Sequence, residues 1–300
     1  MTVPRITSNE RRLAIQKQVA VAPPDFTRGE RRLNRVPRRS PNAVQGAVAL
    51  VTGAAHGIGR AIATAMADAE AVVVAVDQDG PALAALAAEL RSHGATCIAF
   101  TADVHSEQAI HQVIDAISRS YGRLNVVVNN AGVIDVVDFQ DLTLPRWRKV
   151  FSVNVDGVLN VTLAARGLMK ASRPDPEKNG RRGIFINVSS LAADLPRRYQ
   201  ASYSAAKAAL NSMSRSAAES FMDEGIVTSV TVPGNVREGM WQHLTREIAQ
   251  AEGRTEAAVE SERYFQPADE FASLICDVAA VPGFSLNGAL ILPGGEVADI

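Results

Sequence analysis

The sequence predicts an α/β fold: a single domain built on a doubly wound parallel sheet. Short β-branched apolar runs alternate with longer Ala-rich stretches that have helical period. Gly or Asp residues punctuate the junctions between them. Aromatic residues make up only 5% of the chain although 47% is hydrophobic, so Ala, Val, Leu and Ile carry the apolar content. That mixture suits buried parallel strands covered by helices.

Seven runs have the length of buried strands. In order they are 47–52, 71–76, 95–100, 124–128, 183–188, 226–232 and 289–292. Helices are expected between them near 57–69, 81–93, 106–121, 143–170, 202–223 and 267–280. Strands separated by helices of this length pair in parallel through right-handed crossovers. No second alternation or internal repeat follows, so we expect one domain over residues 44–300.

Residues 1–43 differ from the rest and are expected to form a flexible extension. Its first 41 residues carry ten Arg or Lys against three acidic residues, together with five prolines and little hydrophobic period. Such an extension would also result if the sequence were read from a start codon upstream of the natural one. An organellar transit peptide is an alternative, and so is a nucleic-acid arm, although Phe26 is the only aromatic residue available for stacking. Charges interrupt every stretch that could form a secretory signal.

Composition excludes several classes of protein. No apolar run approaches the roughly 18 residues that a membrane helix needs. The formal net charge of −1 provides no overall attraction to nucleic acid or anionic lipid, so neither is an expected partner. Two cysteines, Cys97 and Cys276, cannot build a disulfide framework, which favours a cytoplasmic protein. No metal site is expected, because His105, Glu107 and His111 do not share one helical face.

A glycine-rich turn follows the first expected strand. Gly53, Gly57 and Gly59 lie between that strand and the first helix, where glycines let the backbone approach a pyrophosphate at the positive helix N-terminus. The second strand ends at Asp77. A carboxylate there accepts hydrogen bonds from ribose hydroxyls and repels a 2′-phosphate, which favours NAD over NADP. Asp77 could instead be an ordinary acidic residue between strand and loop.

The spacing TGxxxGxG of this turn resembles the short-chain dehydrogenase/reductase family. Further family motifs occur in order: Asn-Asn-Ala-Gly at 129–132, Asn-Val-Asp-Gly at 154–157, a serine at 190, Tyr-x-x-x-Lys at 203–207 and Pro-Gly at 233–234. The resemblance covers residues 44–300. It implies a Rossmann fold, a nicotinamide cofactor, and a homo-oligomer, either tetramer or dimer.

Four residues are the expected catalytic group. Tyr203 and Lys207 are four residues apart, hence on one helix face, and a nearby ammonium lowers the pKa of a tyrosine from about 10. Tyr203 can then exchange a proton with the substrate, while Ser190 donates a hydrogen bond to its oxygen. The resemblance implies that Lys207 also binds the nicotinamide ribose and that Asn154 positions a water. Ser189 competes with Ser190, and each residue could instead be structural.

The resemblance also implies a set of cofactor contacts. They are Gly53, His56, Gly57, Ile58, Gly59, Asp77, Asp103, Val104, Asn130, Ala131, Gly132, Tyr203, Lys207, Pro233, Gly234 and Val236. One departure concerns Glu238, which stands where the family usually has a threonine near the cofactor. A carboxylate beside phosphates is unfavourable unless it turns away.

We therefore expect an NAD-dependent oxidoreductase that interconverts a secondary alcohol and a ketone of a small molecule. An NADPH-dependent 3-oxoacyl or polyketide-type ketoreductase is the alternative. A catalytically silent nucleotide-binding regulator that uses the basic arm is an alternative of another class. Substrate choice is expected within residues 237–266. Its apolar residues form either a lid or a subunit contact: Met240, Trp241, Leu244, Tyr264 and Phe265.

Overall fold

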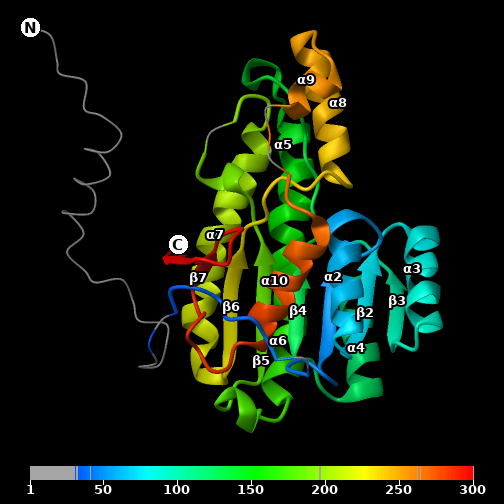
Figure 1. Cartoon of the computed structure of the whole chain (residues 1–300), viewed down its shortest axis with the longest axis vertical. Coiled ribbons are helices and arrows are strands. Elements are labelled where there is room, and N and C mark those ends of the chain that lie inside the picture. The colour runs from blue at the N-terminus through cyan, green and yellow to red at the C-terminus, as the bar shows by residue number, and fades with distance from the viewer. Residues whose placement is uncertain are drawn as a thin grey trace, which may run out of the picture.

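An eight-stranded sheet forms the centre of the computed structural model, in the order β3-β2-β1-β4-β5-β6-β7-β8 (Figure 1). The structure describes residues 31, 33–40, 42–195, 197–261, 263 and 265–299. All strand pairs are parallel except that of β7 with β8. The strand order reverses direction at β1, between β2 and β4. The prediction of a doubly wound parallel α/β sheet is confirmed.

All seven expected strands are present. They are β1 (Val48–Thr52), β2 (Val72–Asp77), β3 (Cys97–Thr101), β4 (Val126–Asn129), β5 (Gly183–Val188), β6 (Ile226–Thr231) and β7 (Ala289–Ile291). The antiparallel β8 (Val297–Asp299) was not expected, because a three-residue strand leaves too short a pattern in the sequence.

Helices cover both faces of the sheet. The principal ones are α2 (Gly57–Asp68), α3 (Gly80–Ser92), α4 (Glu107–Tyr121), α6 (Val158–Ala171), α7 (Ala201–Phe221) and α10 (Ala268–Ala280). Alternation along β1 shows how one strand serves two cores: Ala49 and Val51 pack with the side chains of α2, α3 and α10, whereas Val48 and Leu50 pack with those of α4 and α6. Figure 1 shows α2 and α10 in front of the sheet and α4 and α6 behind it.

The long helix expected over 143–170 is interrupted. It consists of α5 (Leu144–Phe151), a π-helical turn (Ser152–Gly157) and α6. A Cβ atom on Gly157 would lie 2.6 Å from Cγ2 of Val104, so the absence of a side chain lets this turn approach the loop after β3. Single π-turns inside α-helices are frequent at functional sites. Short 3₁₀ turns occupy 139–141, 176–178, 191–193 and 222–224.

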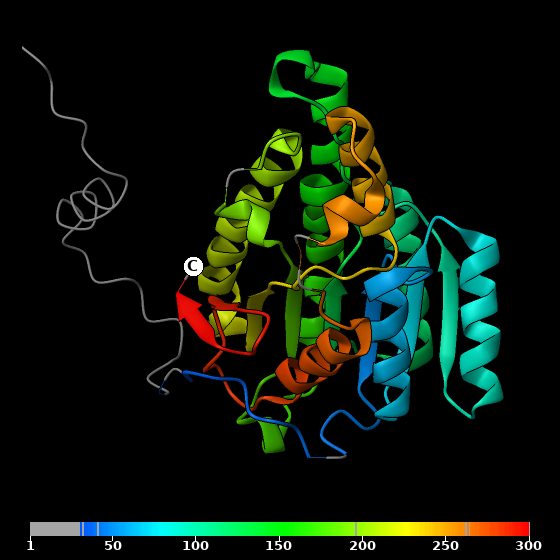
Figure 2. The same cartoon turned by 45° about the horizontal axis from the view of Figure 1, so that its top comes forward.

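Two helices follow β6 where the sequence indicated only a substrate-determining segment. They are α8 (Met240–Glu252) and α9 (Glu256–Ser261). Figures 1 and 2 show both beside α5 at one end of the molecule. Within the described residues, no helix is both long and apolar enough to cross a membrane.

The last part of the predicted extension lies against the domain. Val36 is buried, and its backbone N donates to Gly295 O at 2.8 Å, while Val297 N donates to Asn34 O at 2.9 Å. Arg39 forms an ion pair with the buried carboxylate of Asp277 on α10 at 2.9 Å. Residues 33–40 thus make specific contacts that their composition did not indicate. Residues 1–30 of the predicted flexible arm lie outside the described residues.

Candidate active site

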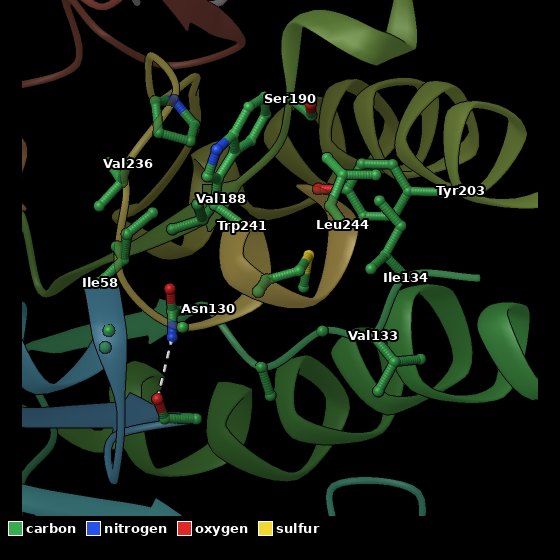
Figure 3. Close-up of a pocket in the computed structure, with 18 of the residues that line it drawn as sticks. Ile58, Asn130, Val133, Ile134, Val188, Ser190, Tyr203, Val236, Trp241 and Leu244 are labelled. Atoms are coloured by element: carbon green, nitrogen blue, oxygen red, sulfur yellow. Dashed lines mark hydrogen bonds between the residues drawn. The ribbon is translucent and has the colours of Figure 1, made fainter. Parts of the chain in front are cut away.

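A cavity of about 390 Å³ opens at the carboxyl ends of the parallel strands (Figure 3). Ligands bind to doubly wound sheets at this edge, where the strand order reverses. All the expected cofactor contacts line this cavity, and Ser190 lines it too. Asn154 is the exception among the expected site residues, since it is fully buried and not part of the cavity wall.

The glycine-rich turn forms one end of the cavity. A Cβ atom on Gly59 would lie 1.9 Å from Gly53 O, so no side chain fits there. Gly53 has a φ of 65° and approaches Ala131 closely. The side chain of Asn130 donates to Thr52 O at 2.9 Å and to Gly53 O at 3.2 Å. These contacts fix the turn against the end of β4.

Helix α2 begins at this turn without a side-chain cap. His56 is its N-cap residue, and its imidazole instead pairs with Asp79 at 2.8 Å. The N-terminus of α2 therefore presents its first N–H groups toward the cavity, together with the positive end of the helix dipole. An uncapped helix start of this kind can accept a phosphate group.

Asp77 lies at the end of β2 and is held by two backbone groups. Its Oδ2 accepts a hydrogen bond from Ala55 N at 2.9 Å, and its Oδ1 accepts one from Asp79 N at 3.0 Å. The carboxylate thus links the glycine-rich turn to the loop after β2. Asp103 has a similar place after β3, where its Oδ1 accepts from His105 N at 2.9 Å. Both acids line the same end of the cavity.

Ser190 and Tyr203 meet at the other end. Ser190 follows β5, and its Oγ accepts a hydrogen bond from Ala192 N at 3.1 Å. Ser190 also lies close enough to the Tyr203 side chain, which comes from the first turn of α7, to lower the pKa of the phenol. Ser189 points elsewhere, donating to Asn211 Oδ1 at 2.6 Å. Strand alternation thus directs Ser190 rather than Ser189 toward Tyr203.

Lys207 lies one turn after Tyr203 on α7. Its Nζ donates to Val188 O at 2.8 Å and lies 5.7 Å from the centre of the Tyr203 ring. Burial lowers the pKa of Lys207 to about 8. Burial also raises the pKa of Tyr203 to about 12, against the effect of the nearby Ser190, which lowers it. The lowered Tyr203 pKa that we expected is not present in the structure without a cofactor, because desolvation outweighs the effect of Ser190.

Asn154 acts on the backbone of the cavity wall. Its Nδ2 donates to Val133 O at 2.9 Å, and its Oδ1 accepts from Val133 N at 2.8 Å. Both ends of the amide are therefore used to hold the segment after β4, which lines the cavity. The side chain comes from the π-helical turn, a feature that is frequent at functional sites.

The turn after β6 is supported by Gln266, which no motif in the sequence marks. Gly234 N donates to Gln266 Oε1 at 3.0 Å, and Gln266 Nε2 donates to Pro293 O at 3.3 Å. No local pattern marks this contact, because the partners are far apart in sequence. Glu238 lines the cavity, and its backbone lies against Gly57 of the glycine-rich turn.

Apolar residues surround the end of the cavity that contains Ser190 and Tyr203, which we call the reacting end. Trp241 packs edge-on against Phe265, with ring centres 5.2 Å apart, and Leu244 joins a buried cluster with Tyr199 and Ile248. Figure 3 shows Trp241 and Leu244 gathered near Ser190 and Tyr203. Met240 also lines the cavity. Tyr264, which we expected in the same group, lies outside the described residues.

A parallel sheet with a glycine-rich turn and a Ser-Tyr-Lys group at one cavity is typical of dinucleotide-dependent oxidoreductases. The family model of short chain dehydrogenases matches residues 47–249. The 3-oxoacyl-[acyl-carrier-protein] reductase of Synechocystis is 32% identical over 260 residues, which cover 83% of this chain and 99% of that protein. The 2,3-dihydro-2,3-dihydroxybenzoate dehydrogenase of Bacillus subtilis is 30% identical over 257 residues, covering 86% and 92%.

Among solved structures, a short chain dehydrogenase from Burkholderia cenocepacia in complex with NADP is 28% identical, with a TM-score of 0.72. The match covers 85% of this chain and 99% of that one. The chain belongs to the short-chain dehydrogenase/reductase family. It is an oxidoreductase that acts on alcohol or ketone groups.

Proposed function

We propose that the chain is an NAD-dependent dehydrogenase that interconverts a secondary alcohol and a ketone. The main support for this proposal is that Ser190, Tyr203 and Lys207 line the same cavity as the glycine-rich turn and Asp77. A bound nicotinamide would accept or supply the hydride. The turn fits such a cofactor, because its glycines leave room and the uncapped start of α2 offers N–H groups to a pyrophosphate.

Each residue then has a distinct role. Ser190 donates a hydrogen bond to the substrate oxygen, and Tyr203 gives that oxygen a proton in reduction or takes one in oxidation. Because burial alone keeps the Tyr203 proton in place, the base form needs positive charge nearby. Lys207 supplies such charge from the same helix face, and the resemblance implies that it also holds a ribose hydroxyl. Asn154 holds the backbone of Val133 at the cavity wall.

The choice of NAD rests on Asp77. Its fixed carboxylate favours two ribose hydroxyls and repels a 2′-phosphate. Because the similar structure from Burkholderia cenocepacia contains NADP, the experiment must also allow for a preference for NADP. The ketoreductase alternative would require tighter binding of NADPH than of NADH.

The test is a titration of the full chain with NADH and NADPH, followed by nicotinamide fluorescence. Asp77→Asn is the suitable variant because it keeps an oxygen to accept from the backbone while removing the charge. We expect wild type to bind NADH at least about tenfold more tightly than NADPH, and the variant to lose this preference. Tighter NADPH binding by wild type would overturn the cofactor assignment, and binding of neither would overturn the dehydrogenase.

Turnover is tested separately with Tyr203→Phe, which keeps the ring and removes the hydroxyl. We expect kcat to fall about 10²- to 10⁴-fold while the variant still binds NADH. A variant with full activity would remove Tyr203 from the reaction.

We also propose that the chain acts as a cytoplasmic homo-oligomer. Leu159 and Leu163 of α6 are exposed in the single chain, at 42% and 59% respectively. Their burial between copies would explain this exposure. The two described cysteines, both buried and unpaired, are compatible with a reducing compartment. Light scattering at several protein concentrations measures the assembly, and a monomeric mass throughout would contradict it.

A further inference from the structure

Two arginines line the cavity together with the apolar residues around Ser190 and Tyr203. Arg197 lies between the Ser190 turn and α7, and Arg263 lies between α9 and the segment that supports the turn after β6. Both line the cavity. The apolar residues that line it are Ile134, Leu191, Ala192, Met240, Trp241, Leu244 and Ile248.

Neither arginine has an anionic partner among the described residues. The Nε atom of Arg263 is enclosed and, within the described part of the chain, has no hydrogen-bond acceptor. Other arginines nearby are paired: Arg198 binds Asp138 at 2.9 Å, and Arg237 binds Glu260 at 2.7 Å. Adjacent residues in sequence, Arg197 and Arg198, therefore have opposite environments, one facing the cavity and the other facing an acid outside it.

The acids that line the cavity lie elsewhere. Asp77 and Asp103 are at the ends of β2 and β3, and the backbone of Glu238 lies against Gly57 at the glycine-rich turn. An enclosed N–H group such as Nε of Arg263 is unfavourable without an acceptor, because its desolvation is not offset by a hydrogen bond. It becomes favourable when an anion binds, and the planar fork of arginine matches a carboxylate.

We propose that the substrate is a hydroxy acid or keto acid whose carboxylate binds Arg197 and Arg263. This inference rests on the proposed function, since the hydroxyl or ketone must face Ser190 and Tyr203. The apolar wall of Ile134, Leu244 and Ile248 suits a hydrocarbon frame between the two polar ends.

The reaction leaves the carboxylate unchanged. In oxidation, the C–H bond at the alcohol carbon breaks and its hydride passes to NAD⁺, while the O–H proton passes to the phenolate of Tyr203. The products are a keto acid, NADH and protonated Tyr203. Reduction is the reverse. The carboxylate serves as an anchor that sets which carbon of the substrate faces the hydride position.

A direct test uses shape-matched probes on the NADH-loaded full chain. Benzoate and benzamide differ in charge but hardly in shape, and quenching of NADH fluorescence reports their binding. We expect benzoate to bind about 10- to 100-fold more tightly than benzamide. Arg197→Gln and Arg263→Gln should each reduce this ratio severalfold. The matched controls Arg198→Gln and Arg246→Gln, both of exposed arginines paired outside the cavity, should not change it.

Turnover supplies the second readout. Hydroxy acids such as 3-hydroxybutanoate and 3-hydroxycyclohexanecarboxylate are compared with their methyl esters, and the acids should have the higher kcat/KM.

Equal binding of benzoate and benzamide in a protein that still binds NADH would overturn the carboxylate assignment but not the proposed dehydrogenase activity. Tighter binding of phenyl phosphate than benzoate would also overturn it, in favour of a phosphorylated substrate. Failure to bind NADH would instead overturn the proposed function itself.

Discussion

The ammonium of Lys207 and the ring of Tyr203 lie 5.7 Å apart on one face of α7, and both side chains are buried. Burial shifts their pKa values in opposite directions, to about 8 for Lys207 and about 12 for Tyr203. In each case burial shifts the pKa toward the neutral form, because desolvation penalises the charged one; with a pKa of about 8, Lys207 is still mostly charged at pH 7. The charged forms of both side chains are therefore destabilised in the cavity, and a bound ligand of opposite charge or with hydrogen-bonding groups can stabilise them.

This destabilisation predicts a pH-dependent stability. The pKa of Lys207 is below its ordinary value of 10.5, so between the two values the unfolded chain binds more protons and stability rises with pH. From about pH 7 to about pH 10, wild type should gain about 2 kcal/mol in free energy of unfolding relative to Lys207→Met. Tyr203 opposes this gain only above its ordinary value of 10.0. Urea titrations at the two pH values measure the change.

Lys149→Met is the matched control, because Lys149 is exposed on α5. It should show no such difference between the two pH values. A constant difference between wild type and Lys207→Met would mean that Lys207 is not desolvated.

The second prediction concerns the glycine-rich turn. Gly59→Ala would place a methyl group 1.9 Å from Gly53 O and 2.5 Å from Asn130 Nδ2. The turn must then move, and we expect a loss of more than about 2 kcal/mol in free energy of unfolding together with loss of NADH binding. Thermal melts and the fluorescence titration measure both effects.

Gly167 in α6 gives the opposite expectation. A Cβ atom there meets nothing within 4 Å, so Gly167→Ala should stabilise the chain by roughly 0.5–1 kcal/mol. Similar effects of the two substitutions would show that the turn is not as tightly packed as described.

The third prediction separates two roles for Asn154. If it positions the wall of the cavity, Asn154→Leu leaves both backbone groups of Val133 without their partner and costs about 2 kcal/mol or more of stability. Its kcat should fall in parallel while the pH profile keeps its shape. A variant with unchanged stability but an altered pH profile would instead favour direct participation in proton transfer.

Much of this site could be predicted from the sequence because its chemistry depends on short spacings. The turn from Gly53 to Gly59, the Asp77 carboxylate and the Tyr203–Lys207 pair each reflect a local geometric requirement, and all of them line one cavity. The fold could also be predicted from local patterns, because buried strands and amphipathic helices differ in hydrophobic period.

The remainder depends on contacts between distant segments. Gln266 supports Gly234 across 32 residues, and Arg197 faces the same cavity as Arg263. No periodicity encodes such proximity. The π-helical turn that carries Asn154, and the contact of its amide with Val133, leave no pattern in the sequence. The raised Tyr203 pKa was not expected, because charge is visible in a sequence whereas burial is not.

The fourth prediction concerns the attachment of residues 33–40. Asp277 is a buried carboxylate that accepts from Arg39 Nη1 at 2.9 Å and from Arg38 Nη1 at 3.2 Å. The Arg38 side chain is 77% exposed and that of Arg39 only 21%. Removing the enclosed partner of a buried charge is costly, whereas an exposed ion pair contributes little.

Arg39→Ala should therefore cost about 2–4 kcal/mol in free energy of unfolding, and Arg38→Ala less than about 1 kcal/mol. Replacing the acid as well, in Arg39→Ala with Asp277→Asn, should recover part of the loss because no charge is then left unpaired. Urea denaturation measures all three variants. Limited trypsin digestion should cut within residues 33–40 faster in Arg39→Ala than in Arg38→Ala, although each variant lacks one arginine. Equal costs for the two single variants would mean that Arg39 does not anchor this segment to α10.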